Sequence, residues 1–167
     1  MRSDQLAGQR ADLPAGRRAN RSVTALLLLG PTALLGGALA FEYLGGLAPC
    51  EMCLWQRWAL AAALALALLG WAIGHARAVL ALAALAVLGG AGIAVFHVGV
   101  EQHWWQGITK CAATLSSGST ADIMGQILAQ PLVRCDAIPW SLLGISMAGW
   151  NAIVSTLIGG TALWRLK

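Results

Sequence analysis

The chain has 167 residues, enough for one domain, of which 58% are hydrophobic and only 11% are charged. Soluble domains carry roughly 25% charged residues, so this composition excludes an ordinary solvated surface and indicates a protein that lies in lipid. The net charge of +4 does not indicate nucleic-acid binding, because the basic residues lie in the N-terminal tail and at the ends of apolar stretches rather than in one patch.

In chain order, a polar and basic tail is followed by four long apolar stretches. The tail covers residues 1–21 and is predicted to be disordered. A helix needs about 20 mostly apolar residues to cross the hydrocarbon core, and each stretch is close to that length. Backbone groups cannot stay unpaired in lipid, so each stretch should be helical. The predicted spans are residues 23–40, 54–73, 79–100 and 142–163.

The predicted fold is therefore an all-α membrane protein, a four-transmembrane-helix bundle that forms one domain over residues 22–167. The first stretch has a competing interpretation, because its basic flank and the run Ala38, Leu39 and Ala40 resemble a signal peptide with a cleavage site. Its apolar run exceeds the usual core of about 7–15 residues. That length favours a retained span.

The distribution of Lys and Arg predicts the orientation of the bundle. Four spans place both termini and the turn at residues 74–78 on one side, with eight basic residues against three on the other side. The positive-inside rule then predicts cytoplasmic termini and two periplasmic loops, residues 41–53 and 101–141. All four cysteines lie on this outer side, where disulfides persist: Cys50, Cys53, Cys111 and Cys135.

Cys50 and Cys53 form a CxxC motif directly before the second span. Such a pair can serve zinc, haem attachment or thiol redox chemistry. Haem attachment requires a following His, whereas Leu54 follows Cys53, and zinc requires further ligands at compact spacing. We therefore predict no metal site. Two cysteines at a helix N-terminus can close a disulfide or keep one sulfur as a thiolate, which the helix dipole favours.

Arg57 lies within about 60° of both cysteines around a helix with 100° per residue. A charged side chain this close to the hydrocarbon indicates function, because it is costly there. It could stabilise a Cys53 thiolate or bind a ligand carbonyl. The alternative is that the side chain extends to the membrane interface.

Cys111 and Cys135 lie in the long outer loop, on either side of a short amphipathic pattern at residues 121–130. That segment is too short to span and is predicted to be a surface helix in the second periplasmic loop. The second pair has two interpretations. It is a structural disulfide that closes the loop, or an exchangeable disulfide that accepts electrons from a partner thiol.

Together these features resemble the DsbB family of bacterial inner-membrane thiol:quinone oxidoreductases. The resemblance covers residues 22–167. It is carried by the run Pro49-Cys50-Glu51-Met52-Cys53-Leu54-Trp55-Gln56-Arg57, by the second cysteine pair, and by residues 135–147, which begin Cys135-Asp136-Ala137-Ile138-Pro139-Trp140.

The resemblance implies a relay that ends on ubiquinone or menaquinone from the membrane pool. Cys50 and Cys53 would be the quinone-facing pair, with Cys53 as the thiolate that meets the quinone and Arg57 helping to hold it. Cys111 and Cys135 would exchange with a DsbA-like periplasmic thioredoxin-fold oxidase, Cys111 forming the mixed disulfide. His97 would line the quinone site; a packed core histidine is the alternative.

Two further classes of protein remain as alternatives. A vitamin K epoxide reductase-like enzyme also has two cysteine pairs in a helical bundle, but there the CxxC follows the loop pair, whereas here it precedes it. A non-enzymatic membrane module would have only structural disulfides, and would neither bind quinone nor exchange with thiol proteins.

Overall fold

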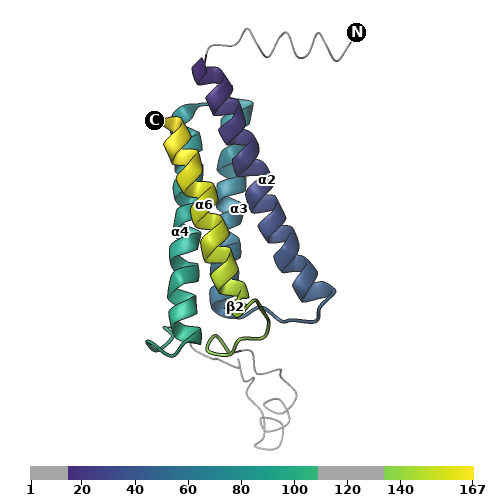
Figure 1. The fold of residues 1–167 in the computed structure, drawn as a ribbon. Helices are drawn as coiled ribbons and strands as arrows, with labels where there is room; N and C mark the ends of the chain where they lie inside the picture. The colour runs from purple at the N-terminus through teal and green to yellow at the C-terminus, as the bar shows by residue number, and fades with distance from the viewer. Residues whose placement is uncertain (1–14, 109–133) are drawn as a thin grey trace, which may run out of the picture.

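The computed structural model describes residues 15–108 and 134–167, and these form four long helices and one small hairpin (Figure 1). The N-terminal end of α2 and the C-terminus lie at one end of the bundle, and the hairpin lies at the other. The elements are α2 (Ala15–Tyr43), α3 (Glu51–Ala72), α4 (Arg77–Glu101), β1 (Ser141–Leu142), β2 (Ile145–Ser146) and α6 (Met147–Leu166).

Three of the described helices are long and apolar enough to cross a membrane: Arg18–Tyr43, Glu51–Ala72 and Arg77–Glu101. They correspond to the first three predicted spans. The fourth helix, α6, has 20 residues and is not in this group. It carries Asn151, Ser155 and Thr156, whose polar side chains lower its hydropathy.

The first helix starts earlier than its predicted span. α2 begins at Ala15, so residues 15–21, which we predicted to belong to a disordered tail, are helical. The basic residues of this segment do not oppose helix formation, because Arg has a high intrinsic helix propensity. Residues 1–14 and the predicted surface helix at 121–130 lie outside the described residues.

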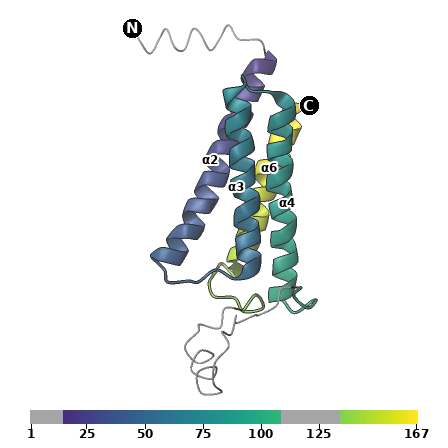
Figure 2. The same ribbon diagram turned by 180° about the vertical axis from the view of Figure 1, so that it is seen from behind.

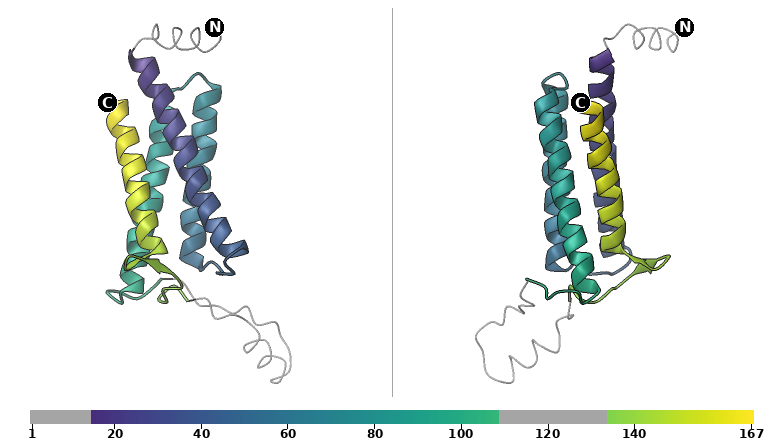
Figure 3. Two further views of the ribbon diagram at one scale, coloured as in Figure 1. Left: turned by 45° about the vertical axis from the view of Figure 1, so that its right-hand side comes forward. Right: turned by 60° about the vertical axis from the view of Figure 1, so that its left-hand side comes forward.

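The fourth helix starts later than predicted, at Met147 rather than near residue 142. The reason is a tight antiparallel hairpin in which Ser141 pairs with Ser146 (Figure 3). Its two turn residues, Leu143 and Gly144, have φ angles of 55° and 77°, the left-handed pair that two-residue hairpin turns require. The Ser146 hydroxyl then caps α6 by accepting a hydrogen bond from the Gly149 N–H at 3.1 Å.

The helices pack through small side chains. α4 packs against α3 and α6, and α2 packs against α3 and α6 (Figure 2). The buried core of this interface includes Ala63, Ala67, Ala83 and Ala84, all fully buried. Small residues let helix backbones approach closely, which is how helices associate in a lipid environment.

At the end of the bundle that holds the C-terminus, the turn between α3 and α4 is hydrogen-bonded to α2. Gly74 and His75 both have positive φ angles, 81° and 66°. The Asn20 side chain donates to the His75 carbonyl at 3.0 Å, and Thr24 Oγ1 lies 2.9 Å from His75 Nδ1. These bonds hold a turn with positive φ angles, a backbone conformation that residues other than glycine rarely adopt.

Candidate active site

The two cysteines of the CxxC motif meet at the start of α3. Cys50 is the N-cap of this helix, and its sulfur accepts a hydrogen bond from the Cys53 backbone N–H at 3.3 Å. The Cys50 thiol donates to the Cys53 sulfur across 3.1 Å. Cys53 therefore has its sulfur in the first helical turn, where the partial positive charge of the helix N-terminus favours an anion.

Cys135 joins this pair from the segment that precedes β1. The sulfurs of Cys50 and Cys135 and one ring nitrogen of His97 all lie within 4.8 Å of one another, and all three residues are buried. Three protein ligands would match a catalytic zinc site, but the sulfurs of Cys50 and Cys53 lie 3.1 Å apart, which suits thiol chemistry, so we treat this cluster as a thiol site. The predicted partner of Cys135 in the loop, Cys111, lies outside the described residues.

The polar surroundings of Cys50 and Cys135 differ. The hydrogen bond to Cys53, together with burial, raises the pKa of the Cys50 thiol far above its ordinary value. Next to Cys135, Arg134 Nε donates to Asp136 Oδ1 at 2.9 Å. The guanidinium lowers the pKa of Asp136, so this flanking pair stays ionised at neutral pH.

Arg57 binds α2 rather than extending freely to the interface. Its guanidinium donates to the Glu42 carboxylate and, at 3.1 Å, to the Ala38 carbonyl oxygen. Both charged side chains are mostly buried, with 17% of Arg57 and 24% of Glu42 exposed. Glu42 falls in the predicted outer loop, residues 41–53, and the sequence did not identify it as a partner of Arg57. The sequence feature that could have identified this partner is an acidic residue at the same end of the bundle as an arginine close to the hydrocarbon.

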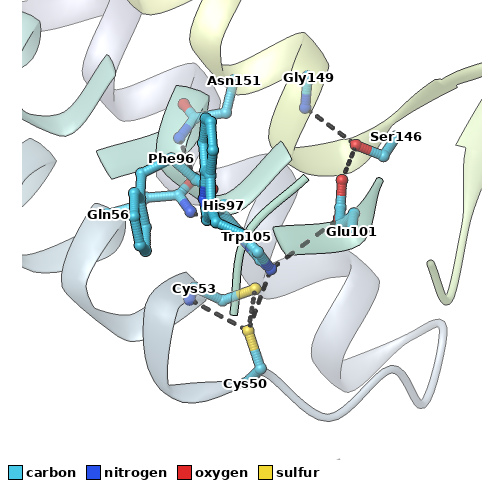
Figure 4. Close-up of polar contacts among 10 residues, drawn as sticks. All are labelled: Cys50, Cys53, Gln56, Phe96, His97, Glu101, Trp105, Ser146, Gly149 and Asn151. Carbon is cyan, nitrogen blue, oxygen red and sulfur yellow. Dashed lines mark hydrogen bonds and ion pairs between the residues drawn. The ribbon is translucent and has the colours of Figure 1, made fainter. Parts of the chain in front are cut away.

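His97 is buried beside the cysteines, at the centre of a polar cluster (Figure 4). Its Nε2 atom lies 3.6 Å from the Cys50 sulfur and 3.9 Å from Glu101 Oε1. Its Nδ1 atom lies 3.0 Å from Gln56 Nε2. Glu101 in turn accepts a hydrogen bond from the Ser146 hydroxyl.

Sequence reasoning missed several members of this cluster. Gln56, Glu101 and Asn151 are polar residues inside or at the ends of apolar helices, and polar residues in such places indicate function or a specific partner. That signal was present in the sequence. What the sequence does not give is the rotation of each helix about its axis. That rotation places Gln56 and Glu101 beside His97 and Asn151 beside Gln56.

A cavity of about 500 Å³ opens beside the cysteines, between α2, α3 and the start of α6. Cys53, Arg57 and His97 lie in its wall, together with apolar side chains from α2 and from the segment that leads to the hairpin. Among the latter, Phe41 and Trp140 pack with ring centroids 4.8 Å apart. The cavity is mostly apolar with a few polar groups that converge on it, as in small-molecule sites.

Comparison with known proteins identifies the family of the chain. The model of the family "Disulfide bond formation protein DsbB" matches residues 20–165. The chain belongs to the DsbB family. It is 37% identical to disulfide bond formation protein B of Verminephrobacter eiseniae over 157 residues, which cover 85% of this chain and 83% of that protein.

Two further relatives extend the similarity. Disulfide bond formation protein B of Methylococcus capsulatus is 34% identical, over 78% of this chain and 84% of that protein. The protein of the same name from Acinetobacter baylyi is 30% identical, over 87% of this chain and 90% of that protein. No solved structure matches the chain. As a member of the DsbB family with three apolar helices, it is a membrane protein of disulfide bond formation.

Proposed function

We propose that this protein reoxidises a DsbA-like periplasmic thiol oxidase and passes the two electrons through its two cysteine pairs to a membrane quinone. The observation that carries the proposal is the position of Cys50, whose sulfur lies 3.1 Å from that of Cys53 and in one cluster with that of Cys135. A relay between two pairs requires such a contact, because thiol–disulfide exchange proceeds by direct attack of one sulfur on another.

The first exchange takes place in the loop pair. A thiolate of the reduced partner attacks Cys111, the Cys111–Cys135 bond breaks, and a mixed disulfide forms. The second thiol of the partner then displaces Cys111, which leaves the partner oxidised and Cys111 and Cys135 reduced. Two electrons have moved to the loop pair, and the disulfide has moved to the partner.

The second exchange connects the pairs. The Cys135 thiolate attacks the Cys50 sulfur, the Cys50–Cys53 bond breaks, and Cys53 leaves as a thiolate at the N-terminus of α3, where the helix dipole stabilises negative charge. Cys111 then attacks Cys135, and Cys50 leaves. The loop disulfide is restored, and Cys50 and Cys53 are reduced.

The cavity beside Cys53 supports a quinone as the final acceptor. Its volume of about 500 Å³ and its largely apolar wall suit a flat ring with an apolar tail. A bound quinone would supply a two-electron oxidant that leaves as quinol. Cys53 would deliver the electrons, and Arg57 would supply hydrogen-bond donors at the cavity wall, where His97 also lies.

The same proposal includes the arrangement in the membrane. All four long helices would span the bacterial inner membrane, with both termini in the cytoplasm and both loops in the periplasm. Residues 121–130 would lie on the outer surface. The positive-inside distribution of Lys and Arg supports this orientation. So does the place of the hairpin, which follows Cys135 in the chain and lies at the end of the bundle opposite the C-terminus (Figure 1).

The test is quinone reduction by the purified full-length protein in detergent, with a reduced DsbA-like protein as electron donor. We expect turnover by the intact chain, and loss of at least a hundredfold in Cys53→Ser and in Cys111→Ser. Thr156→Ala serves as the matched control. Thr156 is exposed on α6 and donates only to the Ala152 carbonyl oxygen, so this variant should keep full turnover.

Each alternative predicts a different result. If turnover survives the loss of Cys111, the loop pair is structural and the relay is wrong. If the intact chain binds no quinone and does not exchange with the thiol protein, it is a structural membrane module. A vitamin K epoxide reductase-like enzyme would reduce quinone epoxide, and the family match over residues 20–165 favours the DsbB-type reaction instead.

A further inference from the structure

A chain of hydrogen bonds crosses three helices and ends on His97. On α6, the Ser155 hydroxyl donates to Asn151 Oδ1 at 3.0 Å. Asn151 Nδ2 donates to Gln56 Oε1 on α3 at 2.6 Å. Gln56 Nε2 then lies 3.0 Å from His97 Nδ1 on α4. Figure 4 shows the part of the chain from Asn151 through Gln56 to the imidazole.

Three of the four residues in this chain are buried, and Asn151 is half-buried. Ser155 is 0%, Gln56 5% and His97 3% exposed. Unpaired polar groups are costly to bury, and the structure satisfies each of these groups through the next one along the chain. The alternating use of donor and acceptor also makes the orientations depend on one another: fixing one amide fixes its neighbour.

This chain determines where the imidazole hydrogen lies. In the orientation that the structure gives the Gln56 amide, its NH₂ group faces His97 Nδ1. This group donates and does not accept, so Nδ1 is the acceptor in this arrangement. A neutral imidazole with an accepting Nδ1 carries its hydrogen on Nε2. The Cys50 sulfur lies 3.6 Å and Glu101 Oε1 3.9 Å from Nε2, and the Cys135 backbone also makes a hydrogen bond to this imidazole.

We propose that Gln56, Asn151 and Ser155 are positioning residues that hold His97 as the Nε2–H tautomer, so that this N–H donates to the Cys50 sulfur when the sulfur is a thiolate. The tautomer itself follows from the hydrogen-bond chain alone; its use in catalysis rests on the proposed function. His97 then acts as a fixed donor, and it does not take the proton of Cys50.

The role of this donor follows from the protons and electrons that move in the last step of the relay, the oxidation of Cys50 and Cys53 by quinone. Cys50 loses its proton and its sulfur bonds to that of Cys53; two electrons pass to the quinone, and both thiol protons end on the quinol. The Cys50 sulfur is negatively charged just before the S–S bond forms. A hydrogen bond to the charged form stabilises it, so the fixed N–H of His97 makes this thiolate accessible inside a buried site.

Other charged and titratable groups also face this site from the elements around it. Cys53 and Arg57 belong to α3, Glu42 reaches the site from α2 through Arg57, and Glu101 lies on α4. Cys135 and Arg134 precede the hairpin. A test must therefore isolate Cys50 from the other thiols and change only the hydrogen-bond chain.

The first test reads the tautomer directly. Full-length protein with His75→Asn and His103→Asn keeps His97 as its single histidine, since the chain has three; Asn tolerates the positive φ angles of both replaced residues. We expect the ¹⁵N shifts of reduced protein, without quinone or partner, to show a protonated Nε2 and an unprotonated Nδ1. Asn151→Leu should give a mixture of tautomers. A protonated Nδ1 in the unaltered chain would overturn the proposal.

The second test reads the consequence at Cys50. A variant with Cys53, Cys111 and Cys135 replaced by Ser has Cys50 as its single thiol, and its alkylation rate is measured against pH. Adding Asn151→Leu or Ser155→Ala should move this profile about half a unit to one unit toward higher pH, because the thiolate loses a fixed donor. Ser155→Thr keeps the hydroxyl, so its alkylation profile should match that of the variant with Ser155.

Neither measurement needs quinone or partner, so failure of the relay and failure of this inference are separable. Loss of turnover with the expected tautomer and profile shift would reject the relay alone. An unchanged alkylation profile in Asn151→Leu, in protein whose melting temperature shows it to be folded, would reject the positioning role whatever the turnover.

Discussion

At the residue level, Arg57 illustrates how a charge can be retained near the hydrocarbon. Its guanidinium binds the Glu42 carboxylate and the Ala38 carbonyl oxygen, both from α2, so the charge is paired within the protein. The planar, multidentate guanidinium suits this geometry, whereas the ammonium of Lys would make a single point contact. Because Arg57 also lines the cavity, the same pair holds α2 against α3 where a ligand would bind.

We therefore predict that Arg57→Gln weakens quinone binding. The variant keeps an amide donor but loses the charge, and a hydrogen bond to a charged group contributes roughly 1.5–3 kcal/mol, so the KM for quinone should rise about tenfold or more. Exchange between the partner and the loop pair should be unaffected, since it precedes the quinone step. Steady-state kinetics with varied quinone, and separately with varied partner, measure both effects.

Arg77→Gln is the matched control for this variant. Arg77 is also an arginine that binds a carbonyl oxygen, that of Lys167 at 3.1 Å, but at the opposite end of the bundle. The variant Arg77→Gln should therefore leave the KM for quinone unchanged. An unchanged KM in Arg57→Gln as well would mean that Arg57 only ties α2 to α3.

At the level of elements, the sequence predicted helices well and their ends less well. Each of the four apolar stretches contains a long helix in the structure, because a long apolar segment in lipid must pair its backbone groups internally. The fourth helix starts late because Leu142, Leu143 and Ile145 are apolar yet form a hairpin. Hydropathy cannot distinguish a hairpin from the first turn of a helix, and Leu143 has a positive φ angle, which residues other than glycine rarely adopt.

The packing of α6 against α4 gives a prediction about two neighbouring glycines. A Cβ at Gly159 would lie 2.6 Å from Leu88 Cγ and 3.1 Å from the Ala84 carbonyl oxygen, whereas a Cβ at Gly160 would have no atom within 4 Å. Gly159→Ala should therefore destabilise the protein by about 1–3 kcal/mol, the usual cost of overpacking. Gly160→Ala should be neutral or stabilise by up to about 1 kcal/mol through helix propensity.

Denaturant unfolding of both variants in the same detergent, followed by circular dichroism, compares them directly. Because the two substitutions are chemically identical and adjacent, any general effect of Ala on helix α6 cancels between them. Equal stabilities would show that α6 and α4 do not pack as closely in the membrane protein as the structure has them.

For the whole molecule, the sequence predicted all four cysteines at one end of a helical bundle, and the three described ones, Cys50, Cys53 and Cys135, lie close together. Hydropathy and the Lys and Arg distribution are enough for that, because the bilayer limits how such helices can be arranged. They could not predict that Asn151 and Gln56 meet at His97, since contacts between helices depend on the rotation of each helix, and α6 is too far along the chain from α3 for local patterns to relate them.

The orientation of the bundle is a further prediction at this scale. Green fluorescent protein fused after Lys167 should fluoresce, and alkaline phosphatase fused at the same residue should be inactive, because the former matures in the cytoplasm and the latter needs periplasmic disulfides. Phosphatase fused after residue 108 should be active. The reverse pattern at both positions would contradict the positive-inside assignment.

The contact between the two cysteine pairs yields the prediction that depends most on the whole fold. Cys50 and Cys135 are distant in sequence, yet their sulfurs belong to one buried cluster within 4.8 Å. A disulfide needs a separation of about 2.05 Å, which requires the segment before β1 to approach α3 slightly. A variant with Cys53→Ser and Cys111→Ser should therefore form the Cys50–Cys135 bond rapidly and nearly completely under a mild oxidant.

The matched control is Cys50→Ser with Cys111→Ser, which leaves Cys53 and Cys135. The structure groups the Cys135 sulfur with that of Cys50, and Cys53 lies on the following turn of α3, so this pair should cross-link at least tenfold more slowly, by the steep dependence of exchange on access. Maleimide-polyethylene glycol labelling of the remaining thiols, followed by gel electrophoresis, gives both rates. Equal rates would mean that the loop segment moves freely over both cysteines, and Cys50 would then lose its place as the residue through which the two pairs communicate.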